Sequence, residues 1–147
     1  MLWQELKDKI YFEDGSLRDI YVLNTTRTDW QKWVALINEK YIVEFYDGKT
    51  DLTSERIDFN AVEEYWESNG TRETIQAKVT LNSIIIMCYF FDDSEIENDI
   101  APEDFKSTMD HDNLIRYLDD ISTTLNKEVY LTDENTKDSI LLKRTTT

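Results

Sequence analysis

Seven carboxylates lie between residues 92 and 104 of this chain, and no lysine or arginine interrupts them. Side chains of this kind can hold a hard cation, act as an acid–base pair, or bind a basic partner. Every second residue from 93 to 99 is acidic, so in an extended chain these four would share one face, roughly 6.5 Å apart. The seven are Asp92, Asp93, Glu95, Glu97, Asp99, Glu103 and Asp104.

Partner binding is the interpretation that we favour for this acidic segment. A calcium or magnesium site is less well supported, because the segment lacks the glycine and the Asp/Asn-rich pattern of an EF-hand loop. Crowded like charges repel one another, and a cationic partner would relieve that repulsion. Solvation alone stays open as an alternative, since physiological salt screens the charges of an exposed loop.

Two aromatic residues extend the predicted partner site. Tyr65 and Trp66 stand between "VEE" and "ES", and aromatic side chains surrounded by carboxylates resemble hot spots for an Arg/Lys-rich surface. Burial in the core is the alternative for both.

Other residues that could do chemistry give no catalytic signature. One histidine and one cysteine cannot supply the four ligands of a structural zinc site. We expect His111, flanked by two aspartates, to be solvated, and Cys88, within an apolar run, to be buried and unreactive. Residues 48–50 match the end of a phosphate loop, but Val43 replaces its first glycine, so a hairpin turn is favoured. We therefore expect a protein without enzymatic activity, cofactor or metal.

The composition narrows the classes of partner. Thirty-one acidic residues against sixteen basic ones give a formal charge of −15, a field that repels nucleic-acid phosphates and anionic lipid. We expect neither direct nucleic-acid binding nor a membrane role. The first residues lack the features of a signal peptide, and a single cysteine allows no internal disulfide, so we expect a cytosolic protein.

The elements that must position these residues follow from periodicity and turn signals. Thr28 with Gln31 suggests a capping box for one helix, and Asn60 an N-cap for another. The run 84–91 is entirely apolar and predicts an interior strand that is covered on both faces and leads into an acidic loop. The predicted strands are 18–24, 40–49, 74–81, 84–91 and 128–132, the predicted helices are 28–40, 60–70 and 110–127, and 50–59 and 139–144 stay undecided.

This order predicts one α+β domain over residues 1–147. We expect a mixed, largely antiparallel sheet of about five strands, packed by two main helices and a short middle helix. A right-handed crossover should place the first two strands parallel.

The stretch "GSLRDIYVLNTTRTDWQKWVALIN", residues 15–38, resembles small bacterial immunity-type proteins, the inhibitors encoded beside secreted or contact-delivered toxins. Residues 88–100 and 125–135 extend the resemblance. It implies an acidic, cytosolic, non-enzymatic protein that binds a toxin tightly, and it carries no binding residue over by alignment.

Three functional hypotheses follow. The first is an immunity-like inhibitor whose acidic segment and neighbouring aromatic residues cover a basic toxin domain. The second is a mimic of nucleic-acid charge that sequesters a DNA-binding protein. The third, ranked last, is an enzyme that uses paired carboxylates, with or without a metal.

Overall fold

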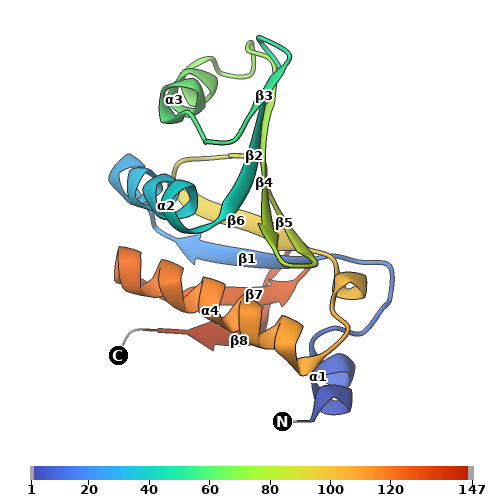
Figure 1. Ribbon diagram of the computed structural model, residues 1–147. Helices are drawn as coiled ribbons and strands as arrows, with labels where there is room; N and C mark the ends of the chain where they lie inside the picture. The colour runs from blue at the N-terminus through green and yellow to red at the C-terminus, as the bar shows by residue number, and fades with distance from the viewer. Residues whose placement is uncertain (1, 146–147) are drawn as a thin grey trace.

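One eight-stranded sheet organises the chain in the computed structural model, which describes residues 2–145 (Figure 1). The strand order is β3-β2-β4-β5-β6-β1-β7-β8, and every neighbouring pair is antiparallel. The α+β class is confirmed, whereas a mixed sheet of about five strands is wrong. The strands are β1 (Arg18–Leu23), β2 (Ile42–Asp47), β3 (Leu52–Ser54), β4 (Ile75–Leu81), β5 (Ile84–Cys88), β6 (Glu95–Ile100), β7 (Val129–Asp133) and β8 (Thr136–Arg144).

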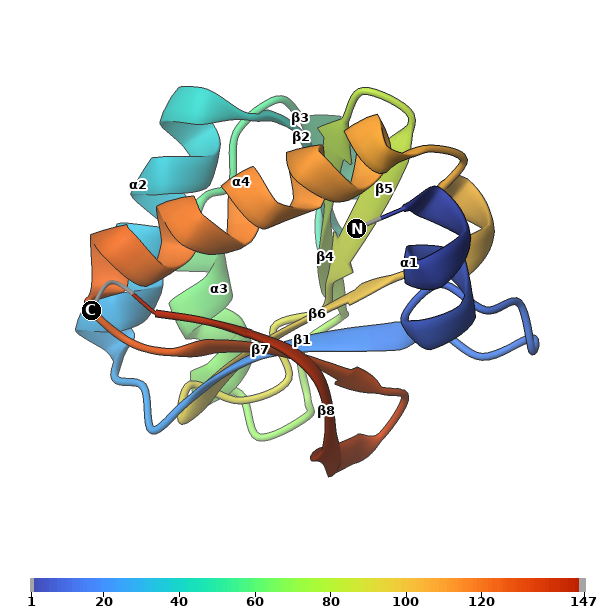
Figure 2. The same cartoon turned by 90° about the horizontal axis from the view of Figure 1, so that it is seen from below.

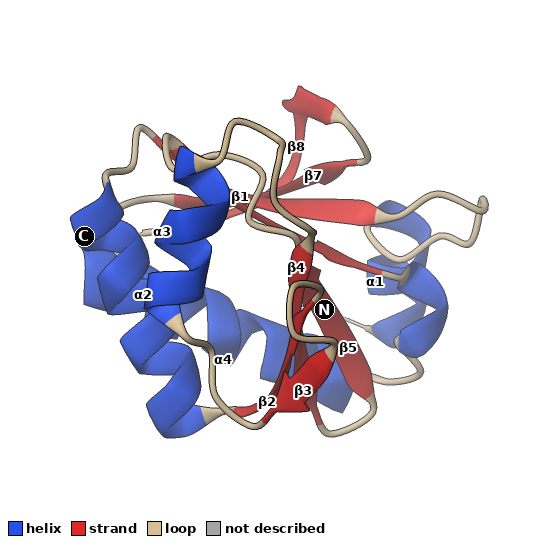
Figure 3. Cartoon of the chain, turned by 90° about the horizontal axis from the view of Figure 1, so that it is seen from above, coloured by secondary structure: helices blue, strands red, loops and turns tan. Residues whose placement is uncertain are grey.

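The helices α2, α3 and α4 form one layer over the sheet (Figure 3). The ring centroids of Trp30 in α2 and Trp66 in α3 are 5.3 Å apart, and α2 also packs against α4. The sequence patterns do not predict α1, which packs near the N-terminal end of α4 (Figure 2). The bounds are α1 (Trp3–Lys9), α2 (Arg27–Lys40), α3 (Phe59–Glu67), the 3₁₀ turn η1 (Pro102–Asp104) and α4 (Thr108–Leu125).

The predicted acidic loop is instead largely a strand, β6, in the interior of the sheet. Ile96, Asn98 and Ile100 face the helices and are almost completely buried. The Tyr117 hydroxyl of α4 donates to Asn98 Oδ1 at 2.6 Å, which fixes that face of the strand. The acidic side chains of β6 therefore project from the opposite side of the sheet.

We call this opposite side the open face. Cross-strand registers place Asp99 of β6 opposite Asp19 of β1 and Met87 of β5. Figure 2 shows α4 on one side of β6, β1 and β7 and the β7–β8 hairpin on the other, and the tip of this hairpin contacts β1, where the Asn135 N–H donates to Asp19. We define the open face by the side chains of Asp19, Tyr21, Met87, Glu95, Glu97, Asp99 and Tyr130.

The first five residues of the apolar run 84–91 form the interior strand β5, which is shorter than predicted, and only one of its faces is covered. Ile84, Ile86 and Cys88 are completely buried under the helices, whereas Ile85 on the open face is 38% exposed. The strand ends at Cys88 because Phe90 adopts a positive φ of 55°. That turn aims the Phe90 carbonyl at α3, where Trp66 Nε1 donates to it at 2.8 Å.

The first two strands run in the same direction, although they are not neighbours. Three strands separate β1 from β2, and the alternation of antiparallel pairs gives both the same sense. A parallel relation is what a helical crossover between them requires. The sequence could not show that later strands would fill the space between them.

Two predicted helix caps are displaced by two residues along the chain. Helix α2 begins with a capping box in which Thr26 and Asp29 exchange hydrogen bonds, rather than with Thr28 and Gln31. Helix α3 is capped by Asp58, whose carboxylate accepts the N–H of Asn60. Each capping side chain satisfies an N–H that would otherwise lack a partner at the helix start.

The capping box of α2 yields a stability prediction. Thr26→Ala removes the side-chain acceptor and should lower the free energy of unfolding by about 1 kcal/mol. Thr28→Ala is the matched control, because Thr28 is exposed within the first turn and should change stability little. Urea denaturation monitored by tryptophan fluorescence measures both, and a larger loss for Thr28→Ala would contradict the observed cap.

Candidate functional site

The seven predicted carboxylates lie in three places along β6 and its flanks. Asp92 and Asp93 precede the strand, the alternating residues Glu95, Glu97 and Asp99 lie on its open face, and residues 103–104 follow it in η1. Six residues of strand separate the first place from the third by roughly 20 Å. One compact patch of all seven carboxylates is therefore ruled out.

Asp92 and Asp93, which precede β6, line a hollow of about 350 Å³ beside the end of α3. It brings together four of the nine predicted partner residues, two aromatic and two acidic. Phe91, 63% exposed, adds an apolar side chain to its rim. The lining residues are Arg27, Tyr65, Trp66, Asn69, Gly70, Phe91, Asp92 and Asp93.

Arg27 already neutralises the acidic side of this hollow. Its Nε donates to Asp93 at 3.0 Å and its Nη1 to Glu67 at 2.8 Å. Its guanidinium also lies 5.5 Å from the ring of Trp66, within the range of a cation–π contact. Trp66 and Asp93 therefore serve first as packing and pairing residues, and neither is free to receive a partner's cation.

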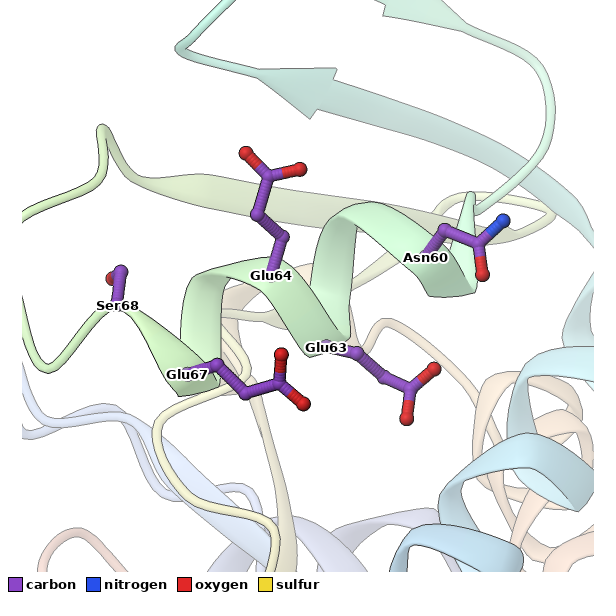
Figure 4. Close-up of a pocket in the computed structure, with 5 residues that line it drawn as sticks. All are labelled: Asn60, Glu63, Glu64, Glu67 and Ser68. Carbon is purple, nitrogen blue, oxygen red and sulfur yellow. The ribbon is translucent and has the colours of Figure 1, made fainter.

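A larger and shallower hollow of about 560 Å³ lies on α3 itself, and it has the same limitation (Figure 4). Glu63 and Glu67 point to one side of the helix, where both pair with Arg27. Glu64 points to the other side and binds Lys49 at 2.6 Å. The chain supplies a cation for each of these glutamates.

The open face brings carboxylates together without that compensation. Glu95, Glu97 and Asp99 lie in a row on β6, and β1 places Tyr21 opposite Glu97 and Asp19 opposite Asp99. Directly opposed residues in an antiparallel pair have Cβ atoms about 5 Å apart. Among residues 2–145, ion pairs reach Glu95 alone of these carboxylates.

Burial and mutual repulsion raise the pKa of three of these groups. The pKa of Asp99 rises to about 6, first because the carboxyl is partly desolvated and then because Asp19, Glu97 and Glu134 are close. Burial likewise raises the pKa of Glu97 and of Asp19. Asp19 is held in place despite this, since its Oδ2 accepts the Asn135 N–H at 2.7 Å and the Tyr21 hydroxyl at 3.2 Å.

Comparison with protein families, curated proteins and solved structures finds no match for this chain. The candidate site therefore rests on its own chemistry, in which a row of half-buried carboxylates borders two tyrosine rings.

The remaining predicted residues do not join this site. Asp104 accepts the Ile85 N–H at 3.2 Å beyond the far end of β6, and its neighbour Glu103 is exposed. Within residues 2–145, no group of three or more His, Cys, Asp or Glu side chains has a metal-binding arrangement. The same residues include no helix of the length and apolarity that a membrane span requires.

The structure confirms the predicted burial of Cys88 but not the predicted solvation of His111. Cys88 is completely buried, and burial raises the pKa of its thiol, as predicted. His111 is half-buried rather than solvated, with its Nδ1 2.6 Å from the Tyr11 hydroxyl, and desolvation lowers its pKa. The residues 48–50 lie in the turn between β2 and β3, as expected.

Sequence reasoning missed Asp19, Tyr21 and Lys137 of the open face, as well as Arg27. Asp19 and Tyr21 alternate within a predicted strand, which indicates a shared face. That signal becomes useful only once β1 is known to pair with β6 in this register. Lys137 has no comparable signal, because its position depends on an irregularity of β8.

The raised pKa of Asp99 predicts how stability depends on pH. Above pH 6 the ionised carboxylate destabilises the folded protein, so Asp99→Asn should raise the melting temperature at pH 7.5. The gain should shrink as the pH falls through about 6 and vanish below about 4, where the carboxyl is protonated in both states.

Thermal unfolding at several pH values measures this difference between variant and wild type. Glu103→Gln is the control, because Glu103 is exposed and its neutralisation should give no comparable gain. An Asp99→Asn variant that is less stable than wild type at pH 7.5 would contradict the assignment.

Proposed function

We propose that this chain is a non-enzymatic binding protein whose open face receives a basic protein partner. The observation that carries the proposal is the pair formed by Glu97 and Asp99, two half-buried carboxylates with raised pKa values and no ion pair to a lysine or arginine within residues 2–145; the buried carboxylate of Asp19 adds to their repulsion. A partner's cation would relieve repulsion that the folded chain alone leaves in place.

The layout of these carboxylates favours an extended surface over a small ion. Successive acidic residues of β6 are about 6.5 Å apart along a strand, so they present a row rather than a converging set of ligands. The tyrosines 21 and 130 and Met87 lie beside the row on the same face. Aromatic residues and methionine are enriched at protein interfaces.

We further propose that the partner is a toxin and that the chain acts as its immunity-type inhibitor. The resemblance involves residues 15–38, 88–100 and 125–135, which contain β1, β6 and β7. These strands are adjacent in the sheet, in the order β6-β1-β7, and together they form the acidic half of the open face. The resembling segments therefore contribute three strands to the proposed binding surface, and they also contain most of α2, which lies on the other side of the sheet.

A charge of −15 adds to the proposed mechanism by accelerating encounter with a basic partner, about 10 to 1,000-fold at low salt. Close charge pairs formed at the interface then slow dissociation, because each such pair can contribute several kcal/mol of coupling. Inhibition needs no chemistry from the chain itself, since covering a basic active site is sufficient.

Affinity capture with matched variants tests this function. The tagged protein is incubated with lysate of the source organism and washed at low and at high salt. We expect wild type to retain one basic protein at high salt, and Glu95→Gln/Glu97→Gln/Asp99→Asn to lose it. The control Glu39→Gln/Glu55→Gln/Glu73→Gln removes the same charge from exposed positions elsewhere and should retain it.

Other results would overturn parts of the proposal. Many DNA-binding proteins that all elute at high salt would indicate the charge mimic. Equal retention by both triple variants would move the interface away from the open face. If the retained protein inhibits growth when expressed alone, co-expression of the chain should restore growth, and failure to do so would exclude the immunity role.

A further inference from the structure

A bulge in β8 sends Lys137 across the open face. Thr132 of β7 pairs with Ile140, whereas the next residue, Asp133, pairs with Thr136. Residues 137–139 therefore have no counterpart on β7, and a strand with extra residues bends and redirects its side chains. The hairpin tip is held down as well, because the Asn135 N–H donates to Asp19.

The redirected lysine makes two contacts that a partner's cation would also make. Its Nζ lies 2.7 Å from Glu95 Oε2 and 5.3 Å from the centroid of the Tyr21 ring. The side chain remains 49% exposed, and exposed ion pairs of this kind contribute little stability. Lys137 is thus held in place weakly.

A groove of about 330 Å³ surrounds this lysine, with more apolar than polar surface in its lining. It lies over β1, β7 and β8 and adjoins the row of carboxylates on β6. A long cationic side chain fits such a place, because its hydrocarbon stem packs on apolar surface while its head reaches the carboxylates. The lining residues are Tyr21, Leu23, Tyr130, Thr132, Lys137, Asp138 and Ile140.

We propose that this groove receives an arginine side chain of the basic partner and that Lys137 occupies the place until the arginine displaces it. The inference rests on the proposed function and names the contact at its centre. A guanidinium suits the place better than the ammonium of Lys137 does, because it stacks on tyrosine and binds carboxylates with two parallel hydrogen bonds. Glu97, next along the face from Glu95, has no ion pair within residues 2–145.

The charge of the chain argues against a second copy as the occupant. Two chains of −15 each repel one another, and this face is among the acidic ones. Nucleic acid is disfavoured for the same reason. A cationic side chain is the occupant whose charge complements the site.

If an arginine displaces Lys137 from the groove, replacement of Lys137 should strengthen the binding of arginine to the chain. The probe is an acetylated, amidated hexa-arginine peptide, titrated at low ionic strength into the ¹⁵N-labelled chain. We expect it to shift the amide resonances of Tyr21, Glu95 and Lys137, and to bind Lys137→Met about twofold to fivefold more tightly than wild type, in line with the loss of one exposed ion pair.

Lys49→Met is the matched control for the change in net charge. Lys49 is 54% exposed and binds Glu64 at 2.6 Å, which matches the exposure and ion-pair distance of Lys137 at a site away from the open face, although Glu64 also pairs with Arg72. Its affinity for the peptide should rise much less than that of Lys137→Met. Lys137→Arg should bind more weakly than Lys137→Met, because the guanidinium retains the competing contacts.

The two proposals fail in different ways. Open-face shifts with equal affinities for Lys137→Met and Lys49→Met would overturn displacement while leaving the open face as the cation-binding surface. Absence of open-face shifts in wild type and in both variants would overturn this inference and the proposed function together. If Lys137→Met binds the peptide more tightly but the resonance shifts lie elsewhere on the chain, the groove is not the binding site.

Discussion

Alternation along β6 is the constraint on which the candidate site depends. One face of this strand must fill the core beneath α4, so Ile96, Asn98 and Ile100 point inward and the acidic residues between them have only the open face. Antiparallel pairing then aligns them with Asp19 and Tyr21 of β1. The crowding of carboxylates is thus a consequence of the requirement to bury every second residue.

Several arginines bind groups elsewhere in the fold, so they do not neutralise the carboxylates of the open face. Arg18 is completely buried and binds the carbonyl oxygens of Ile10 and Phe12, which ties the N-terminal segment to the start of β1. Arg27 joins α2 to the loop before β6, and Arg144 joins β8 to α4 through Asp119. These arginines link elements of the fold, while Glu97 and Asp99 on the open face have no ion pair within residues 2–145.

Local patterns predicted the elements whose side chains obey one period, and they failed where contacts distant in sequence decide. The alternation in 75–81 and the apolar stripe of α2 predicted β4 and that helix correctly. The residues 95–100 are mostly polar, so their composition does not predict a strand, although their carboxylates alternate as they would on one face of a strand. The threonine-rich start of α2 offered several caps, and only the fold selects Thr26.

The number of strands in the sheet and the position of Lys137 depend on edge strands, whose sequences carry no burial pattern. The edge strands β3 and β8 have largely exposed side chains, so burial imposes no period on them. The bulge at 137–139 is defined by pairing with β7, a relation that local sequence does not encode.

That bulge also affects how the sheet ends. An edge strand of nine residues is a template on which another chain can add strands and begin an aggregate. The register shifts in β8 interrupt its regular ladder, and Lys137, Lys143 and Arg144 place charge along it. The opposite edge, β3, is only three residues long. Both ends of the sheet thus resist the addition of strands from another copy, so edge-to-edge association of the chain is disfavoured.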